Sequence, residues 1–232
     1  MTLSISEMSL SRIAQCPTFR CDPRYYAKVA IAAEAKVRSA SFFELGEFLP
    51  TPAIKGIQPS YLDAPTDDSV PVVNTLSVQG LKVNEDDCRH ISRDDYDDIE
   101  GVRKLRKDDV LLTMDGGVSI GKAALFVSGG DFTVDSHVCI LRPVGIAPRS
   151  LVYLLASPMG QQQFRRAESG ASGQTAVTEE DIRRFVFPSS LLVELDAVVD
   201  GIENERAKIE KERAKLAKRE AAAWQKLEAL TI

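Results

Sequence analysis

The feature that most constrains the fold is a stretch of helix-forming residues from position 189 to about position 230. Only Gly201 within it is a residue that weakens a helix interior. About forty residues, rising about 1.5 Å each, make a rod of about 60 Å. A helix of this kind is not held in water by propensity alone, so it must pack on another surface.

Apolar residues recur along this stretch every seven positions, which is the period of a coiled coil. Charged pairs, Glu205 with Arg206 and Glu212 with Arg213, interrupt the second apolar row. We therefore predict that the helix pairs with another chain; the alternative is a single charged helix lying on its own domain. Trp224 stands beside the row and is predicted to be a packing residue. The predicted dimerisation row is Leu195, Ile202, Ile209, Leu216, Ala223 and Leu230.

The chain before the helix changes character twice. Short β-type runs separated by turns occupy about 42–147, and no helical pattern of 10–15 residues lies between them. A mixed or antiparallel sheet therefore fits better than alternating β-α-β units. Residues 150–169 have helical spacing, with a break at Ser157-Pro158. The predicted fold class is α+β: a β-rich domain over 1–188, followed by a long C-terminal coiled-coil helix over 189–232.

A glycine-rich segment, ESGASGQTAVTEEDIRRFVFP, joins the two parts at 168–188. Its glycines permit tight turns. Thr178, three residues before Asp181, is the expected cap of a short helix. The apolar FVFP that follows indicates a return to extended chain before the long helix begins.

The net charge of −5 does not exclude nucleic acid, because DNA responds to a local patch rather than to a sum. Acidic residues are concentrated at 63–68, 84–87 and 93–100, whereas basic residues gather at 103–107, 165–166 and 183–184. No apolar run approaches the roughly 20 residues that cross a bilayer. The N-terminal residues lack the pattern of a signal peptide. The expected location is the cytoplasm, with no membrane association.

Catalytic and metal-binding motifs are weak. GGVSIGKA at 116–123 matches the start of a phosphate-binding loop, but Ala123 stands where Mg²⁺ binding requires Ser or Thr. A glycine-rich hairpin between two core strands is the preferred interpretation. The four cysteines and two histidines lack the paired spacings of a zinc site. We predict a non-catalytic chain without a cofactor or a metal.

In order along the chain, several segments resemble the specificity (S) subunit of type I restriction–modification systems. They are RCDPRYY (20–26), KGIQPSY (55–61), VPVVNTLSVQG (70–80), LRKDDVLLTMDGGVSIGKAALF (105–126), FTVDSHVCILRP (132–143) and SPMGQQQFRRAESGASGQTAVTEEDIRRFVFP (157–188). The resemblance covers about residues 20–230. S subunits carry two target recognition domains and two spacer helices, whereas this sequence has one of each and no internal repeat. It resembles half a subunit.

The resemblance implies a non-catalytic protein that recognises double-stranded DNA and docks adenine methyltransferase (M) subunits, with or without a restriction (R) subunit. Two copies related by a two-fold axis would rebuild the full arrangement and recognise a palindromic bipartite site. A homodimer is therefore expected, with the helices setting the spacing between half-sites. The alternative is a free-standing DNA-binding or coiled-coil interaction protein without a methyltransferase partner.

Proteins of this kind hold phosphates with Lys and Arg and contact base edges with a few polar side chains. Asn74 could bind adenine through its amide or could equally satisfy a turn. The predicted DNA-binding residues are Lys55, Asn74, Lys82, Arg89, His90, Arg93, Lys104, Arg106, Lys107 and Lys122.

Overall fold

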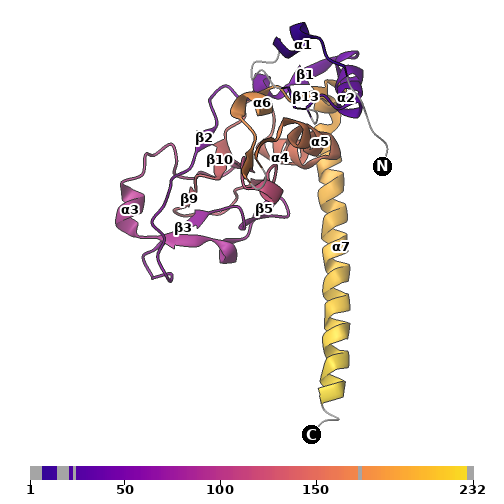
Figure 1. Cartoon of the computed structure of the whole chain (residues 1–232). Helices are drawn as coiled ribbons and strands as arrows, with labels where there is room; N and C mark the ends of the chain where they lie inside the picture. Colours follow the sequence, from indigo (N-terminus) through magenta and orange to yellow (C-terminus); the bar gives the residue numbers. More distant parts are fainter. Residues whose placement is uncertain (1–6, 15–20, 23–24, 172–173, 229–232) are drawn as a thin grey trace. The chain divides into compact units, whose positions relative to one another are not determined.

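The computed structural model describes residues 7–14, 21–22, 25–171 and 174–228. The chain divides into two compact units, Met1–Leu191 and Leu192–Ile232. All the strands belong to the first unit, and the second is formed by the C-terminal helix (Figure 1). Among the described residues, no helix is both long enough and apolar enough to cross a membrane.

The largest sheet of the first unit has six strands in the order β2-β10-β7-β8-β5-β4. The central strands pair antiparallel, whereas β5 and β8 run parallel, so the sheet is mixed as predicted. Among the β-type runs that the sequence predicts between 42 and 147 are DVLLTM (109–114), AALFV (123–127) and HVCILRP (137–143), and these contain β7, β8 and β10. The strands are β2 (Ile54–Lys55), β4 (Val78–Gln79), β5 (Lys82–Val83), β7 (Val110–Thr113), β8 (Ala123–Leu125) and β10 (Val138–Leu141).

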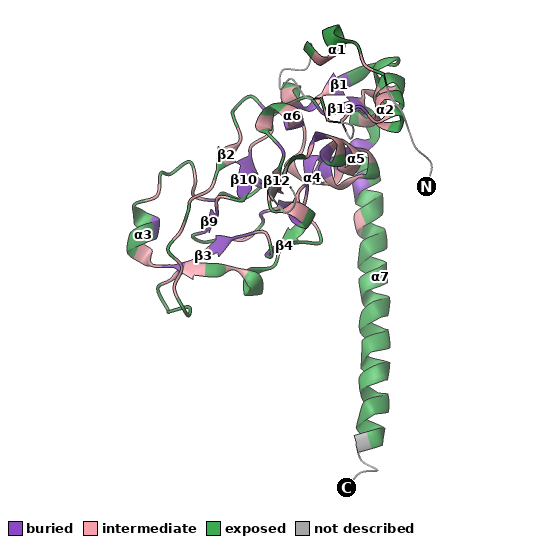
Figure 2. Ribbon diagram, viewed as in Figure 1, coloured by how far each residue is buried: buried purple, intermediate pink, exposed green. Residues whose placement is uncertain are grey.

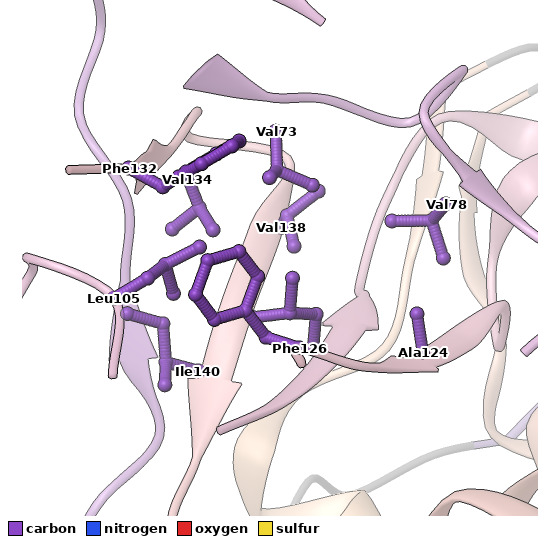
Figure 3. Packing of buried hydrophobic residues seen from close by; sticks show 10 residues of the cluster. Val73, Val78, Leu105, Ala124, Phe126, Phe132, Val134, Val138 and Ile140 are labelled. Carbon is purple, nitrogen blue, oxygen red and sulfur yellow. The ribbon is translucent and has the colours of Figure 1, made fainter. Parts of the chain in front are cut away.

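A three-stranded sheet, in the order β6-β3-β9, shares its core with the large one. It consists of β3 (Val70–Val73), β6 (Arg89–Ile91) and β9 (Thr133–Val134), and helix α3 (Arg93–Asp97) follows β6. Phe126 lies in the shared cluster (Figure 3), 5.1 Å between ring centroids from Phe132 in an edge-on contact. Val73 and Val134 bring the small sheet into the same cluster. Every residue of β7 and β10 is buried, which explains why the two strands are apolar except for Thr113.

Two helices, α4 (Pro148–Ala156) and α5 (Pro158–Ala167), confirm the predicted break at Ser157-Pro158. Ser157 caps α5, because its Oγ accepts a hydrogen bond from the backbone N–H of Gly160 at 3.1 Å. Pro158 then occupies the first helical position, where a missing N–H costs nothing.

The segment GGVSIGKA forms the connection between antiparallel β7 and β8, as predicted. Gly116, Gly117 and Gly121 have φ values of +96°, +62° and +80°, which explains the choice of glycine at these positions. A short 3₁₀ turn, η3 (Gly117–Ser119), leads into β8 rather than into a helix. The arrangement therefore lacks the helix N-terminus on which a phosphate-binding loop depends.

The segment that closes the first unit is more regular than the sequence indicated. Its described residues form a hairpin of β11 (Ser169–Ala171) and β12 (Gln174–Ala176), which was not predicted. Thr178 and Asp181 form the predicted capping box at the start of α6 (Glu179–Arg183). Strand β13 (Val186–Pro188) then pairs antiparallel with β1 (Phe42–Glu44). The remaining elements are α1 (Leu10–Ala14), α2 (Lys28–Arg38), η1 (Leu45–Phe48) and η2 (Glu85–Asp87).

The C-terminal helix α7 (Ser190–Glu228) confirms the predicted long helix. Beyond its first turns nearly every described side chain is exposed (Figure 2). Within the predicted dimerisation row, Leu195 is buried, with only 7% of its surface exposed, whereas Ile202, Ile209, Leu216 and Ala223 are exposed. Leu230 lies outside the described residues. The pairing of this helix with another chain stays a prediction.

Candidate nucleic-acid interface

Six of the predicted DNA-binding residues lie on the small sheet and on the helix and loop beside it. Arg89 of β6 lies over the ring of Tyr61, with its guanidinium carbon 3.6 Å from the ring centroid. Its side chain is exposed, and no described carboxylate forms an ion pair with it. Burial, followed by the charge of Asp135, raises the pKa of Tyr61 to about 12, so the phenol stays neutral beneath the cation. Arg89 therefore presents a positioned charge to solvent.

A second aromatic ring, Tyr96 of α3, organises two further cations. Lys104 Nζ lies 4.4 Å from the ring centroid and donates to the carbonyl of Asp97 at 3.3 Å. Arg93 lies 5.5 Å from the same centroid, but it forms ion pairs with Asp131 at 2.5 Å and Asp68 at 3.4 Å. Lys104 is the more available of the two for a phosphate, because Arg93 is already neutralised by carboxylates.

His90 and the loop before β7 complete this region. The Nδ1 atom of His90 lies 2.9 Å from the hydroxyl of Ser69 across the β3–β6 pair. Arg106 and Lys107 are exposed in the loop that leads to β7. The backbone N–H of Arg106 donates to Asp109 at 2.9 Å, which fixes the loop to the end of the strand. We refer to Arg89, Lys104, Arg106 and Lys107 as the basic surface; His90 follows Arg89 directly in β6, so its side chain points to the other face of the sheet.

The other predicted residues are placed differently. Asn74 is 6% exposed; its Oδ1 accepts from the backbone of Leu76 and Ser77, and its Nδ2 donates to the carbonyl of Asp87. The amide oxygen is therefore engaged within its own turn, which is the second of the two roles left open by the sequence, and the amide nitrogen is held by the 3₁₀ turn η2 at Asp87. Lys55 and Lys82 are exposed on strands of the large sheet.

The glycine-rich loop at 116–122 and the turn at 74–77 lie next to each other, which the sequence did not predict. Lys122 Nζ donates to the carbonyl of Thr75 at 3.4 Å, which links the glycine-rich loop to the turn at 74–77. Val118 at the tip of the first loop is 99% exposed, and Leu76 at the tip of the second is 67% exposed. Aliphatic side chains held outward on rigid turns can contact the methyl group of thymine. A Gly-Gly pair next to a lone valine was the sequence signal for such a tip.

His137 stands at the base of the glycine-rich loop, where its Nδ1 forms an ion pair with Asp115. The hydrogen bond that His137 donates to the Asp115 carboxylate raises the pKa of His137 above its ordinary value of 6.5. The pair therefore stabilises the loop fully below about pH 6.5 and loses that contribution as the pH rises through the raised pKa. The contribution is small, because the His137 side chain is 53% exposed.

Metal and thiol chemistry find little support in the described part of the chain. No group of three His, Cys, Asp or Glu side chains there could hold a metal ion. Burial raises the pKa of Cys139 to about 12 and that of Cys88 to about 11, so both thiols are protonated at neutral pH.

Comparison with solved structures shows which fold this is. A chain from the structure of a type I restriction–modification system aligns with a TM-score of 0.54 at 16% identity over 88% of this chain. The S subunit of the type I system from M. genitalium aligns with a TM-score of 0.50 at 14% identity over 74% of it. The fold is that of a type I specificity subunit. Neither the protein-family profiles nor the curated proteins include a match to the sequence.

The specificity-subunit fold confirms the fold implied by the sequence resemblance. The type IIG restriction endonuclease BpuSI also contains it, with a TM-score of 0.50 at 12% identity over 76% of this chain. The chain spans about half of the first two structures, namely 51% and 40% of their lengths. One β-rich unit and one long helix are therefore matched to parts of larger proteins.

Proposed function

We propose that this chain is a half-length DNA specificity subunit of a type I restriction–modification complex, or of a related defence methylation complex. It is non-catalytic, acts in the cytoplasm, recognises one half-site of double-stranded DNA and docks methyltransferase subunits. The observation that carries the proposal is the match of nearly nine tenths of this chain to only half of a type I system chain. One recognition unit followed by one long helix is half of a full-length specificity subunit, so two copies of this chain together would supply a complete one.

Two copies would associate through α7. Ile202, Ile209 and Leu216 lie seven residues apart and are exposed in the single chain, which leaves an apolar stripe in water. Pairing two such stripes about a two-fold axis would cover both of them at once. With the helices antiparallel, as in S subunits, the recognition units would stand at opposite ends and the dimer would recognise a palindromic bipartite sequence.

DNA would be held first by phosphate contacts. The basic surface offers Arg89 and Lys104 on aromatic rings and Arg106 and Lys107 at the edge of a strand. Such contacts set affinity and register, whereas base recognition falls to other groups. Val118 and Leu76, at the tips of adjacent loops, are the exposed side chains best suited to touch base edges.

One experiment distinguishes this proposal from the alternative, which is a free-standing DNA-binding protein without a methyltransferase partner. The chain is expressed together with each candidate adenine methyltransferase subunit from its own genome, in cells that lack adenine methylation, and methylated adenines are mapped by sequencing. We expect both proteins to purify together and methylation to occur at one palindromic bipartite sequence. Methylation without sequence preference, or failure of the two proteins to associate, would contradict the proposal.

Salt dependence of binding tests the phosphate contacts. In complex with the methyltransferase, Lys107→Ala is expected to weaken binding to all sequences alike and to lower the slope of log K against log salt by about one unit. Lys28→Ala, which removes an exposed lysine from α2, is the matched control and should leave the slope unchanged. Fluorescence anisotropy titrations at several salt concentrations measure the slope. A changed sequence preference with an unchanged slope would assign Lys107 to base recognition instead.

A further inference from the structure

The first unit carries an open apolar groove that the proposed function does not use. It has a volume of about 580 Å³ and lies between α2, α5 and β13. Its walls include Ala30, Ala33, Val37, Met159, Val186 and Pro188. Helix α2 has no buried residue, so the small apolar side chains on its groove face remain uncovered. A surface of this size and composition is typical of a binding site for another apolar element.

We propose that this groove receives the C-terminal end of α7 from a second copy of the chain, with Trp224 and Leu227 as the docking side chains. The inference rests on the antiparallel homodimer of the proposed function and names a second contact within it. Each copy would offer one groove and one helix end.

In an antiparallel dimer, symmetry brings the C-terminal end of the partner's α7 close to this groove. Pro188 borders the groove and stands two residues before α7 begins at Ser190. If the two-fold axis passes Ile209, residues equally far from 209 on either side face each other, so Leu227 faces Leu191. If Ile202 faces Ile209 instead, Trp224 faces Phe187. In either register the end of one helix arrives where the other chain leaves β13 and enters α7.

The chemistry of the two surfaces also matches. Trp224 and Leu227 are 58% and 54% exposed in the single chain, which is unusual for large apolar side chains this close together. Ala221 lies one turn before Trp224 on the same face of α7, and its small side chain allows close approach to Ala30 and Ala33 on α2. Glu34 at the groove edge already pairs with Arg38 and Arg166, so covering it leaves no unpaired carboxylate. Gln162 on the rim offers an amide oxygen to the indole N–H.

Two such contacts per dimer would supplement a stripe that is narrow because charged residues occupy its second row. An aromatic side chain seated in an apolar pocket is the commonest kind of energetic anchor in interfaces. The arrangement is isologous and closed, since each copy uses the same two surfaces once.

Trp224 is the only tryptophan, so all tryptophan emission comes from this side chain, and the groove variant separates the groove contact from pairing of the helices. Emission and iodide quenching are measured on the full chain over a dilution series, with sedimentation velocity on the same samples. We expect short-wavelength, quencher-protected emission in the dimer that moves to longer wavelength as the dimer dissociates. Ala33→Glu, which places a carboxylate in the groove, should leave Trp224 quenchable even in the remaining dimer. Ala32→Glu, on the exposed face of the same helix, is the control and should behave like the parent chain.

The outcomes are distinguishable. A dimer whose Trp224 is as accessible as in the monomer would overturn the groove contact while leaving the dimer intact, and so would protection that appears only when methyltransferase is added. A chain that is monomeric at tens of micromolar would overturn the proposed homodimer itself. The quenching of the parent chain needs no substitution, so the test stands even if Ala33→Glu fails to fold.

Discussion

Ile209→Glu is expected to convert the proposed homodimer into a monomer while leaving the first unit folded. Ile209 is 43% exposed in the single chain, so a glutamate there meets water and costs the isolated chain little. In an antiparallel pair centred on this position, two carboxylates would face each other inside an apolar stripe. Burying unpaired charge in this way costs about 3 kcal/mol or more, which weakens association at least about 100-fold.

Sedimentation velocity measures the change directly, and circular dichroism verifies folding. Ala207→Glu adds the same charge two residues away, off the row, and should leave the dimer unchanged. Specific DNA binding by the Ile209→Glu complex should fall much more than non-specific binding, because only one half-site is engaged at a time. An unchanged dimer would show that α7 pairs through another face.

The elements that the sequence predicted best are those defined by periodicity or by local chemistry. The seven-residue row and the near absence of helix-weakening residues predicted α7, and the short β-type runs between turns predicted β7 and β10. Ser157 and Thr178 accept hydrogen bonds from backbone N–H groups three residues further along the chain. The starts of α5 and α6 could therefore be located without knowledge of the fold. Each of these signals is complete within one segment of the chain.

The site was harder to predict, because its geometry is made by residues far apart in the sequence. Arg89 and Tyr61 are 28 positions apart, and nothing in either segment indicates that the ring lies under the guanidinium. The amide of Asn74 could have faced DNA or its own turn, and only the positions of Leu76 and Ser77 decide between them. The groove beside α2 likewise depends on the placement of α5 and β13.

Asp109 gives the strongest case of such a long-range contact. The sequence indicated it only as the residue before a strand, yet its side chain is 4% exposed and accepts two hydrogen bonds from Arg142, at 2.7 and 2.9 Å. The same carboxylate accepts from the backbone N–H of Arg106, and Arg142 also donates to the carbonyl of Lys104 at 3.4 Å. One ion pair thus holds the loop of the basic surface against β10.

Asp109→Ala is therefore expected to cost about 3–5 kcal/mol, because it leaves the guanidinium of Arg142 without its charge partner in a mostly buried position. That is a large share of the roughly 5–15 kcal/mol that stabilises a domain. Urea unfolding measures the loss, and Asp67→Ala, at an exposed position, is the control with an expected change below about 0.5 kcal/mol.

Replacing both partners, Asp109→Leu with Arg142→Met, should recover much of the stability, since no buried charge remains unpaired. The double variant should still bind DNA more weakly than the parent chain, because the carboxylate no longer anchors Arg106; full recovery of affinity would show that this loop does not contact phosphate.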